Sequence, residues 1–160
     1  MENQNKFKII IPSYNNEEWV EPNIASIINQ TYTNYDVLYI NDASTDNTSN
    51  KVNNIINEYN LSNWTLVTNS ENQRRGYNIS PYNKNIINFM DNDNDILLFI
   101  DGDDWLSDND VLFQLNKFYN QNQYWMTYGG MYCYPSGNPG NPQNTKYNQH
   151  IHLNNLYRKD

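Results

Sequence analysis

Apolar runs alternate with polar stretches along this chain of 160 residues, in the order expected of strands followed by helices. Short apolar runs bounded by turn-forming residues are typical of strands that are covered on both faces. Such runs predict strands at 8–12, 35–41, 64–68 and 96–100. Pro12 fits the end of the first run, because a central strand tolerates proline only there.

Apolar residues at helical spacing follow each of these runs. Val20, Ile24 and Ile27 predict a helix that begins at about Glu17 and ends at Ile28. The later helices are expected from a cap at Ser44, Thr45 or Asp46 to Tyr59, over 79–90 with Pro81 in the first turn, and over 111–119. Another strand is predicted at 124–134, interrupted by Gly129 and Gly130, and irregular structure from 135 to about 144.

The predicted strands and helices alternate four times along the chain. That order predicts an α/β fold with a mostly parallel sheet, flanked by helices and connected by right-handed crossovers. The length fits a single domain covering 1–160, large enough to bury a core without staples.

Composition narrows the class of protein. The formal net charge is −8 and only ten residues are Lys or Arg, which argues against a nucleic-acid surface. Cys133 is the one cysteine, so no disulfide forms within the chain. No run approaches the roughly 20 apolar residues of a membrane span, and the N-terminus lacks the apolar region of a signal peptide. We expect a soluble protein, cytoplasmic by default.

The most informative stretch is ILLFIDGDDWL at 96–106. Its apolar run ends abruptly in Asp101, Gly102, Asp103 and Asp104, which places three carboxylates at the end of a buried strand. Carboxylates this close repel one another unless a proton or a cation lies between them, so a divalent metal is the natural hypothesis. Oxygen ligands suit Mg²⁺ or Mn²⁺, and no cluster of His and Cys points to zinc. A turn with a helix cap is the plainer alternative.

Polar residues follow the other predicted strands as well, and the carboxyl ends of parallel strands lie along one edge of a sheet. Tyr14 could stack on a flat ring and Asp42 could accept hydrogen bonds from a base or ribose. Arg74 or Arg75 could hold phosphate, although a solvated loop pair fits them equally well. We favour a site role for Asp42 and a capping role for Asp46. Together these are the parts of a nucleotide-diphosphate site.

The residues at 9–48, IIIPSYNNEEWVEPNIASIINQTYTNYDVLYINDASTDNT, resemble the opening of a family 2 glycosyltransferase, and FIDGDDWL at 99–106 resembles the Asp-X-Asp motif of that family. The resemblance implies a Rossmann-like GT-A sheet. It also implies inverting transfer of a sugar from a nucleotide diphosphate, commonly UDP, to an acceptor hydroxyl, assisted by Mn²⁺ or Mg²⁺. By motif position, Pro12, Tyr14 and Asp42 would contact the base and ribose, and Arg75 the diphosphate.

The same resemblance assigns Asp101 and Asp103 to the ribose and the metal. Gly102 between them would let the backbone approach the ligand closely. A metal there would offset the negative charge that builds on the β-phosphate when the sugar leaves, without any proton transfer.

The general base of an inverting transferase has no clear candidate. In the resembled family it lies after the Asp-X-Asp strand, but Asp108 and Asp110 fit the start of a helix, and the next carboxylate side chain is Asp160. We therefore expect the N-terminal, donor-binding part of a longer protein, truncated at the acceptor-binding end, or an inactive domain. A non-catalytic nucleotide-sugar binding module is the alternative. Nucleotidyltransferase chemistry is disfavoured, because no Gly-rich phosphate loop with a Lys follows the first strand.

Overall fold

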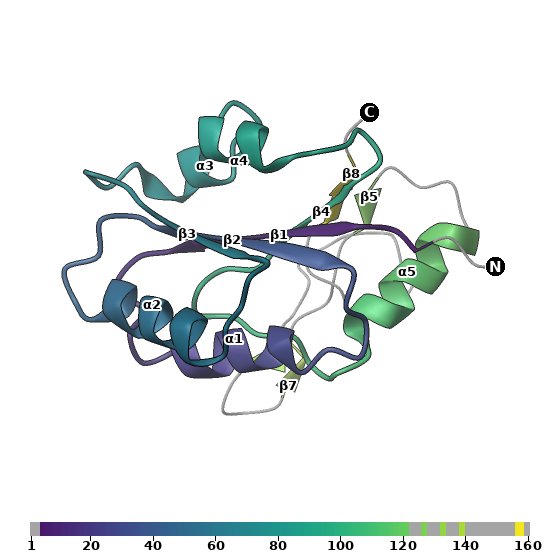
Figure 1. Cartoon of the computed structure of the whole chain (residues 1–160), viewed down its shortest axis with the longest axis horizontal. Coiled ribbons are helices and arrows are strands. Elements are labelled where there is room, and N and C mark those ends of the chain that lie inside the picture. The colour runs from purple at the N-terminus through teal and green to yellow at the C-terminus, as the bar shows by residue number, and fades with distance from the viewer. Residues whose placement is uncertain (1–3, 122–125, 128–131, 134–137, 140–155, 159–160) are drawn as a thin grey trace.

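The computed structural model describes residues 4–121, 126–127, 132–133, 138–139 and 156–158. A sheet in the order β3-β2-β1-β4-β8-β5 runs through the molecule with helices on both faces (Figure 1). The strands are β1 Phe7–Ser13, β2 Tyr35–Asn41, β3 Trp64–Thr68, β4 Ile96–Phe99, β5 Met126–Thr127 and β8 Leu156–Arg158, with β6 Tyr132–Cys133 and β7 Asn138–Pro139 paired separately. The helices are α1 Val20–Ile28, α2 Thr48–Glu58, α3 Arg74–Asn78, α4 Lys84–Phe89 and α5 Val111–Gln121.

The first four strands are parallel, which confirms the predicted α/β fold. β1 pairs with β2 along its whole length, from Phe7 opposite Tyr35 to Ser13 opposite Asn41, and with β4 on its other side. β3 continues the parallel sheet beyond β2. β8 runs antiparallel to both β4 and β5 and comes from a stretch that the sequence left unassigned.

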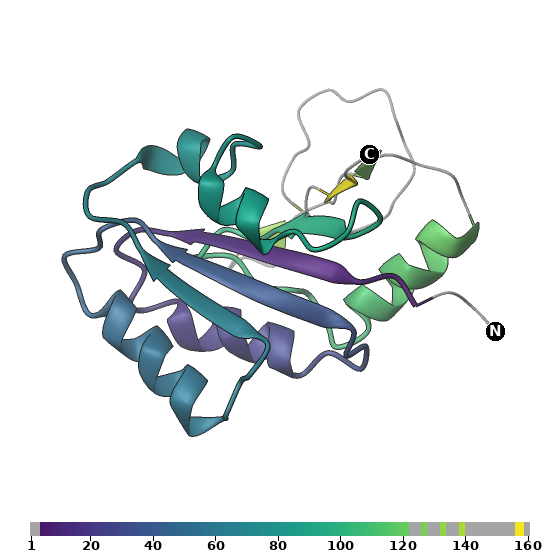
Figure 2. The same ribbon diagram turned by 45° about the horizontal axis from the view of Figure 1, so that its top comes forward.

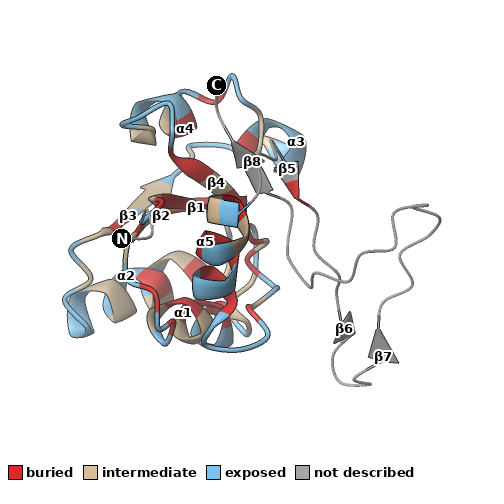
Figure 3. Cartoon of the chain, turned by 90° about the vertical axis from the view of Figure 1, so that its right-hand side faces the viewer, coloured by how far each residue is buried: buried red, intermediate tan, exposed pale blue. Residues whose placement is uncertain are grey.

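Alternation along β1 divides the core between the two faces of the sheet. Phe7, Ile9 and Ile11 pack in the larger cluster, with residues of α1, α2 and α5. Ile10 packs on the opposite face with Ile86 of α4. The turned view shows α1 and α2 below the sheet and α3 with α4 above it (Figure 2). β1 is buried along its full length between these layers (Figure 3).

Lys8 is the one charged residue within β1, and it is 2% exposed. Its Nζ lies 2.8 Å from Asp36 Oδ2 and 2.5 Å from Asp91 Oδ2. Burial alone lowers the pKa of Lys8, but hydrogen bonds and charges from these two carboxylates outweigh it and raise the pKa above its ordinary value. The buried charge is therefore paired, as a buried cation requires.

The helix predicted at 79–90 is wrong over its first half. The chain instead forms α3, which begins in the expected loop, and α4, which begins at Lys84. The Ser80 hydroxyl accepts from Tyr82 N at 3.2 Å, and the Asn83 side chain accepts from Asn85 N at 2.9 Å as the cap of α4. Side-chain bonds of this kind compete with a continuous helix, and Pro81 supplies no N–H to extend one.

The first helix starts at Val20, later than the predicted Glu17. The predicted strand at 124–134 is described only at 126–127 and 132–133, where β5 and β6 lie. Its remaining residues, including Gly129 and Gly130, lie outside the described residues, as does the stretch from 140 to 144. Within the described ranges, each helix is too short or too polar to cross a bilayer.

Candidate functional site

Loops after β1, β2, β3 and β4 meet at the carboxyl edge of the parallel sheet, as predicted. Backbone bonds tie them in pairs: Asp42 N donates to Ser13 O at 2.8 Å, and Gly102 N donates to Pro12 O at 2.9 Å. The chain passes from β1 outward to β3 and then returns to β4 on the other side of β1. Ligands of open α/β sheets bind outside such a topological switch point.

The loop after β1 is fastened to the loop after β2. Asn15 N donates to Ser44 Oγ at 3.0 Å, and Asn15 Oδ1 accepts from Thr45 N at 2.8 Å. Both loops contain a non-glycine residue in the left-handed region, Asn15 with φ 53 and Ala43 with φ 58. The ring of Tyr14 is 47% exposed beside these contacts, so it is open to a planar ligand.

The N-cap of α2 is Asn47, whose side chain makes no capping bond, so the cap predicted at Asp46 is wrong by one residue. Asp46 bonds the first turn of the helix from the preceding position. Its carboxylate accepts from Thr48 N at 3.0 Å and from Glu17 N at 3.1 Å. Burial acts to raise the pKa of Asp46, but the bonds from Thr48 and Glu17 outweigh it and lower the pKa. Glu17 in turn accepts from Asn47 N at 2.7 Å, so it braces the loop before α1 instead of opening the helix.

Asp42 is buried and joins the loop after β2 to the loop after β3. Its carboxylate accepts from Asn69 Nδ2 at 2.7 Å, Gln73 N at 2.8 Å and Arg74 N at 2.9 Å. Burial acts to raise the pKa of Asp42, but hydrogen bonds from Gln73, Asn69, Asn78 and Arg74 outweigh it and lower the pKa. The carboxylate of Asp42 therefore holds the two loops together, and its predicted contact with a base or ribose stays a prediction.

Arg75 and Asp101 form an ion pair across the edge. Arg75 Nε lies 2.9 Å from Asp101 Oδ1 and 3.0 Å from Oδ2, and the two side chains are 58% and 29% exposed. Arg74, which precedes Arg75, is held at φ 66 while its N–H donates to Asp42. The structure thus brings together the residue expected at the diphosphate and one expected at the metal.

Asp103 and Asp104 follow in the same turn, and both are exposed. Partial desolvation of the Asp104 carboxyl, then the charges of Asp103 and Asp101, raise the pKa of Asp104, and Arg75 offsets part of this. Among the described residues, no three side chains of His, Cys, Asp or Glu converge on one metal position. These residues alone do not make an all-protein metal cage.

Gly102 packs directly against β1. A Cβ on it would overlap Ser13 Oγ and lie 2.6 Å from Ser13 Cβ and 2.8 Å from Asn16 Nδ2. Only glycine lets the turn lie this close to the end of β1. Its predicted role, close approach to a ligand, stays a prediction.

Sequence reasoning missed the amide side chains behind these loops. Asn69 Nδ2 bonds both Asp42 Oδ1 and, at 3.0 Å, Asn78 Oδ1. Asn23 is 0% exposed on α1 and donates to backbone carbonyls of the turn at 101–104. Its signal was available, because Asn23 is a polar residue within the apolar stripe of Val20, Ile24 and Ile27.

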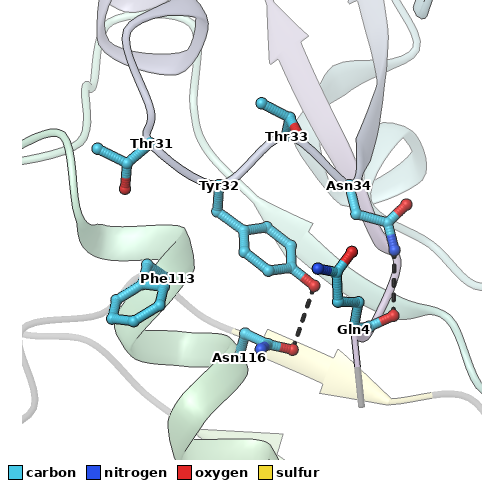
Figure 4. A pocket seen from close by; sticks show the side chains of 7 residues that line it. All are labelled: Gln4, Thr31, Tyr32, Thr33, Asn34, Phe113 and Asn116. Carbon is cyan, nitrogen blue, oxygen red and sulfur yellow. Dashed lines mark hydrogen bonds between the residues drawn. The ribbon is translucent and has the colours of Figure 1, made fainter. Parts of the chain in front are cut away.

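A cavity of about 630 Å³ lies at the opposite, amino edge of the sheet (Figure 4). It is lined by Gln4, Thr31, Tyr32, Thr33, Asn34, Phe113 and Asn116. Tyr32 OH donates to Asn5 O at 2.7 Å and lies 3.2 Å from Asn116 Oδ1. No acidic or basic side chain lines this cavity, so it lacks the groups that recognise a phosphate.

Comparison with known proteins identifies the family and the fold. A model of the family described as glycosyl transferase family 2 matches residues 8–160. An uncharacterized glycosyltransferase of Haemophilus influenzae is 30% identical over 131 residues, which are 81% of this chain and 49% of that protein. Staphylococcus aureus TarS 1–349 in complex with UDP-GlcNAc has a TM-score of 0.70 at 20% identity, over 96% of this chain and 45% of that chain. The mannosyltransferase PcManGT of Pyrobaculum calidifontis, in complex with GDP-Man and Mn²⁺, has a TM-score of 0.63 at 20% identity. The match covers 82% of this chain and 36% of that chain.

The chain therefore belongs to glycosyl transferase family 2, and the fold is that of GT-A glycosyltransferases. The resemblance found in the sequence is confirmed. The chain spans about half the length of the Haemophilus relative that it matches over most of its own length.

Proposed function

We propose that this chain is the donor-binding part of an inverting, metal-dependent glycosyltransferase that takes its sugar from a nucleotide diphosphate, with UDP as the nucleotide. The observation that carries the proposal is the Arg75–Asp101 pair at the β1/β4 switch point, beside Asp42 and the exposed Tyr14. These groups provide a cation for the diphosphate, carboxylates for a metal and ribose, and a ring for the base.

The donor would exchange the partners of this pair. Arg75 is held at Asp101 through Nε, and both side chains remain partly exposed, so the pair contributes little to stability. A bound diphosphate gives the guanidinium a bidentate anionic partner and frees the Asp101 carboxylate. The ion pair is therefore a resting arrangement that a nucleotide diphosphate displaces at little cost.

The carboxylates of the 101–104 turn fit a hard divalent cation. Mg²⁺ is commonly held by one or two carboxylates together with substrate phosphates, so the absence of a three-residue cage among the described residues matches this mode. Asp101 and Asp103 would hold Mn²⁺ or Mg²⁺, which supplies charge to the leaving diphosphate. Burial first, and then the charges of Asp103 and Asp101, raise the pKa of Asp104, so a cation at this turn would meet neighbouring negative charges.

UDP as the nucleotide is supported by the solved TarS complex with UDP-GlcNAc, which shares the fold. PcManGT shares the fold as well and binds GDP-Man, so the fold alone does not choose the base. Choice between bases would lie with Tyr14 and Asp42, together with Pro12 near the end of β1.

Isothermal calorimetry with UDP and Mn²⁺ tests the proposal. We expect binding to the wild-type chain, loss of metal-dependent binding in Asp103→Ala, and no change in Glu58→Ala, which removes an exposed carboxylate at the far end of α2. GDP in place of UDP should bind more weakly. Absence of UDP binding, or equal binding to Asp103→Ala, would contradict the donor and metal assignments respectively.

A non-catalytic nucleotide-sugar binding module is the second candidate. It is favoured by the sequence between Asp110 and Asp160, which contains no carboxylate that could act as a general base. Release of free sugar from a UDP-sugar by this chain would rule the module out. Binding without hydrolysis, together with transfer by a longer form of the protein, would support the donor-domain reading.

A further inference from the structure

Three polar side chains, two in α1 and one just after its C-terminal end, bond the segment that follows β4. Asn23, Ser26 and Gln30 are spaced at i, i+3 and i+7, so they share one side of the helix. Asn23 is 0% exposed and Gln30 is 6% exposed. Buried polar side chains need hydrogen-bond partners, and here the partners are backbone groups between 101 and 112.

The bonds nearest the site surround Asp103. Asn23 Nδ2 donates to Asp101 O at 3.2 Å and to Asp104 O at 2.7 Å. Ser26 Oγ accepts from Leu106 N at 3.1 Å and donates to Asn23 O at 2.7 Å. The backbone is thus fixed two residues before, immediately after and three residues beyond Asp103.

Gln30 continues the same row of bonds away from the site. Its Nε2 donates to Asp108 O at 2.6 Å, and its Oε1 accepts from Leu112 N at 3.0 Å, at the start of α5. Thr31 N donates to Asn109 O at 2.8 Å alongside. The whole connection from β4 to α5 is therefore held to α1 by side-chain amides and a hydroxyl.

Asn23 destabilises the fold through its side-chain oxygen, so a purely structural role does not explain it. Its Oδ1 is buried and has no hydrogen-bond partner among the described residues. A buried acceptor without a partner destabilises a fold, and the other buried residues of α1, Val20, Ile24 and Ile27, are apolar. The amide is explained by what its Nδ2 holds, which is the turn that carries the acidic residues.

We propose that Asn23 and Ser26 are positioning residues of the donor site. They set the backbone of 101–106, and through it the directions of the Asp101 and Asp103 carboxylates, from the buried side of the turn. They contact no nucleotide themselves. This inference rests on the proposed function, because it concerns how the turn meets a metal and a diphosphate.

The test measures UDP affinity in the presence of Mn²⁺ together with amide hydrogen exchange of the chain without ligand. Asn23→Leu keeps the size and removes both donated bonds, and Ser26→Ala removes the hydroxyl. We expect each substitution to lower the affinity for UDP in the presence of Mn²⁺ about tenfold. Losses of this size are typical when a residue that orients a metal ligand is removed. Exchange of the Gly102, Asp104 and Leu106 amides should become faster in both variants.

Two matched variants separate positioning from stability. Ser26→Thr keeps a hydroxyl at the same place and should restore affinity to within about twofold of wild type. Tyr35→Phe removes a buried hydroxyl of β2 that donates to Ile27 O in α1, the helix that contains Asn23 and Ser26, at 3.2 Å. It should lower the melting temperature without changing UDP affinity.

The outcomes distinguish the two proposals. A wild-type chain that does not bind UDP with Mn²⁺ overturns the proposed function and this inference with it. Wild-type binding with unchanged affinity in both Asn23→Leu and Ser26→Ala overturns the inference alone. If Asn23→Leu does not fold, the Ser26 variants decide, and a Ser26→Thr chain as weak as Ser26→Ala contradicts the role of the hydroxyl.

Discussion

The two edges of the parallel sheet differ in the charge of the side chains that they carry. The amino edge has a cavity of about 630 Å³, yet its lining is neutral and its polar groups bond to one another, as Tyr32 does with Asn5 O. The carboxyl edge carries Asp42, Arg75 and the acidic turn from Asp101 on loops that are bonded together. We therefore propose the donor site at the charged carboxyl edge and not at the neutral cavity of the amino edge.

The largest effect at the carboxyl edge should come from Gly102→Ala. A Cβ there would overlap Ser13, so we expect a loss of about 3 kcal/mol in the free energy of unfolding, the upper part of the usual range for overpacking. Displacement of the turn should also abolish Mn²⁺-dependent UDP binding. Urea unfolding and calorimetry measure the two effects.

Gly76→Ala is the matched control for that substitution. A Cβ on Gly76 meets no atom within 4 Å, and Gly76 lies inside α3. The change should be neutral or stabilise by up to about 1 kcal/mol, since alanine favours a helix. An equal loss of stability in the two variants would show that the contact with Ser13 does not constrain the turn.

Asp42→Asn should have the next largest effect. It weakens three bonds that join the loops after β2 and β3, two of them from backbone N–H groups to a charged acceptor. Hydrogen bonds to a charged group contribute about 1.5–3 kcal/mol, so we expect a loss of about 2 kcal/mol by urea unfolding. If the variant is as stable as wild type, the Asp42 carboxylate does not hold the loops after β2 and β3 together.

The carboxyl edge and the Lys8–Asp36 pair should both contribute to the pH dependence of stability, because Lys6 and Lys8 outweigh burial and lower the pKa of Asp36. The folded pKa values of Asp42 and Asp46 lie below their unfolded values, so their contribution is present above about pH 4 and is lost as the pH falls further. The pKa of Lys8 is raised, so its contribution is present below its unfolded pKa and is lost as the pH rises past its folded pKa. Urea unfolding between pH 3 and 7 should show a shallower acid slope in Asp42→Asn.

The smallest effect is expected at the amino edge. Tyr32→Phe removes a buried hydroxyl that donates to Asn5 O, and it should cost about 1 kcal/mol in stability. UDP affinity should be unchanged, because the cavity and the proposed donor site lie at opposite edges. Weaker UDP binding in this variant would indicate that the nucleotide binds at the amino edge, which would contradict the proposed donor site.

The strands were predictable because buried parallel strands consist of apolar runs with clear ends. The bounds of β2 and β3 match the predicted 35–41 and 64–68, and β1 extends only slightly beyond 8–12. The segment from 74 to 83 was mispredicted because its conformation depends on bonds to single side chains. Asp42 fixes Arg74 in a left-handed conformation, and Ser80 with Asn83 interrupts the helix.

The residues of the site were predictable as a set, but their arrangement was not. Convergence of the loops follows from the parallel sheet, so Asp42, Arg75 and Asp101 could be placed at one edge. The pairing of Arg75 with Asp101 depends on tertiary structure, since the two residues are 26 positions apart. Asn23 interrupts the apolar stripe of Val20, Ile24 and Ile27 in the sequence, and only the fold shows which backbone groups its amide bonds.

A crystal structure of the chain with UDP and Mn²⁺ tests the central claim most directly. We predict manganese anomalous density beside the carboxylates of Asp101 and Asp103, with the diphosphate next to Arg75 and the Arg75–Asp101 pair separated. The uracil should lie between Tyr14 and the loop that holds Asp42. UDP bound in the cavity of Tyr32 and Phe113, or manganese remote from the 101–104 turn, would contradict the assignment of the carboxyl edge as the donor site.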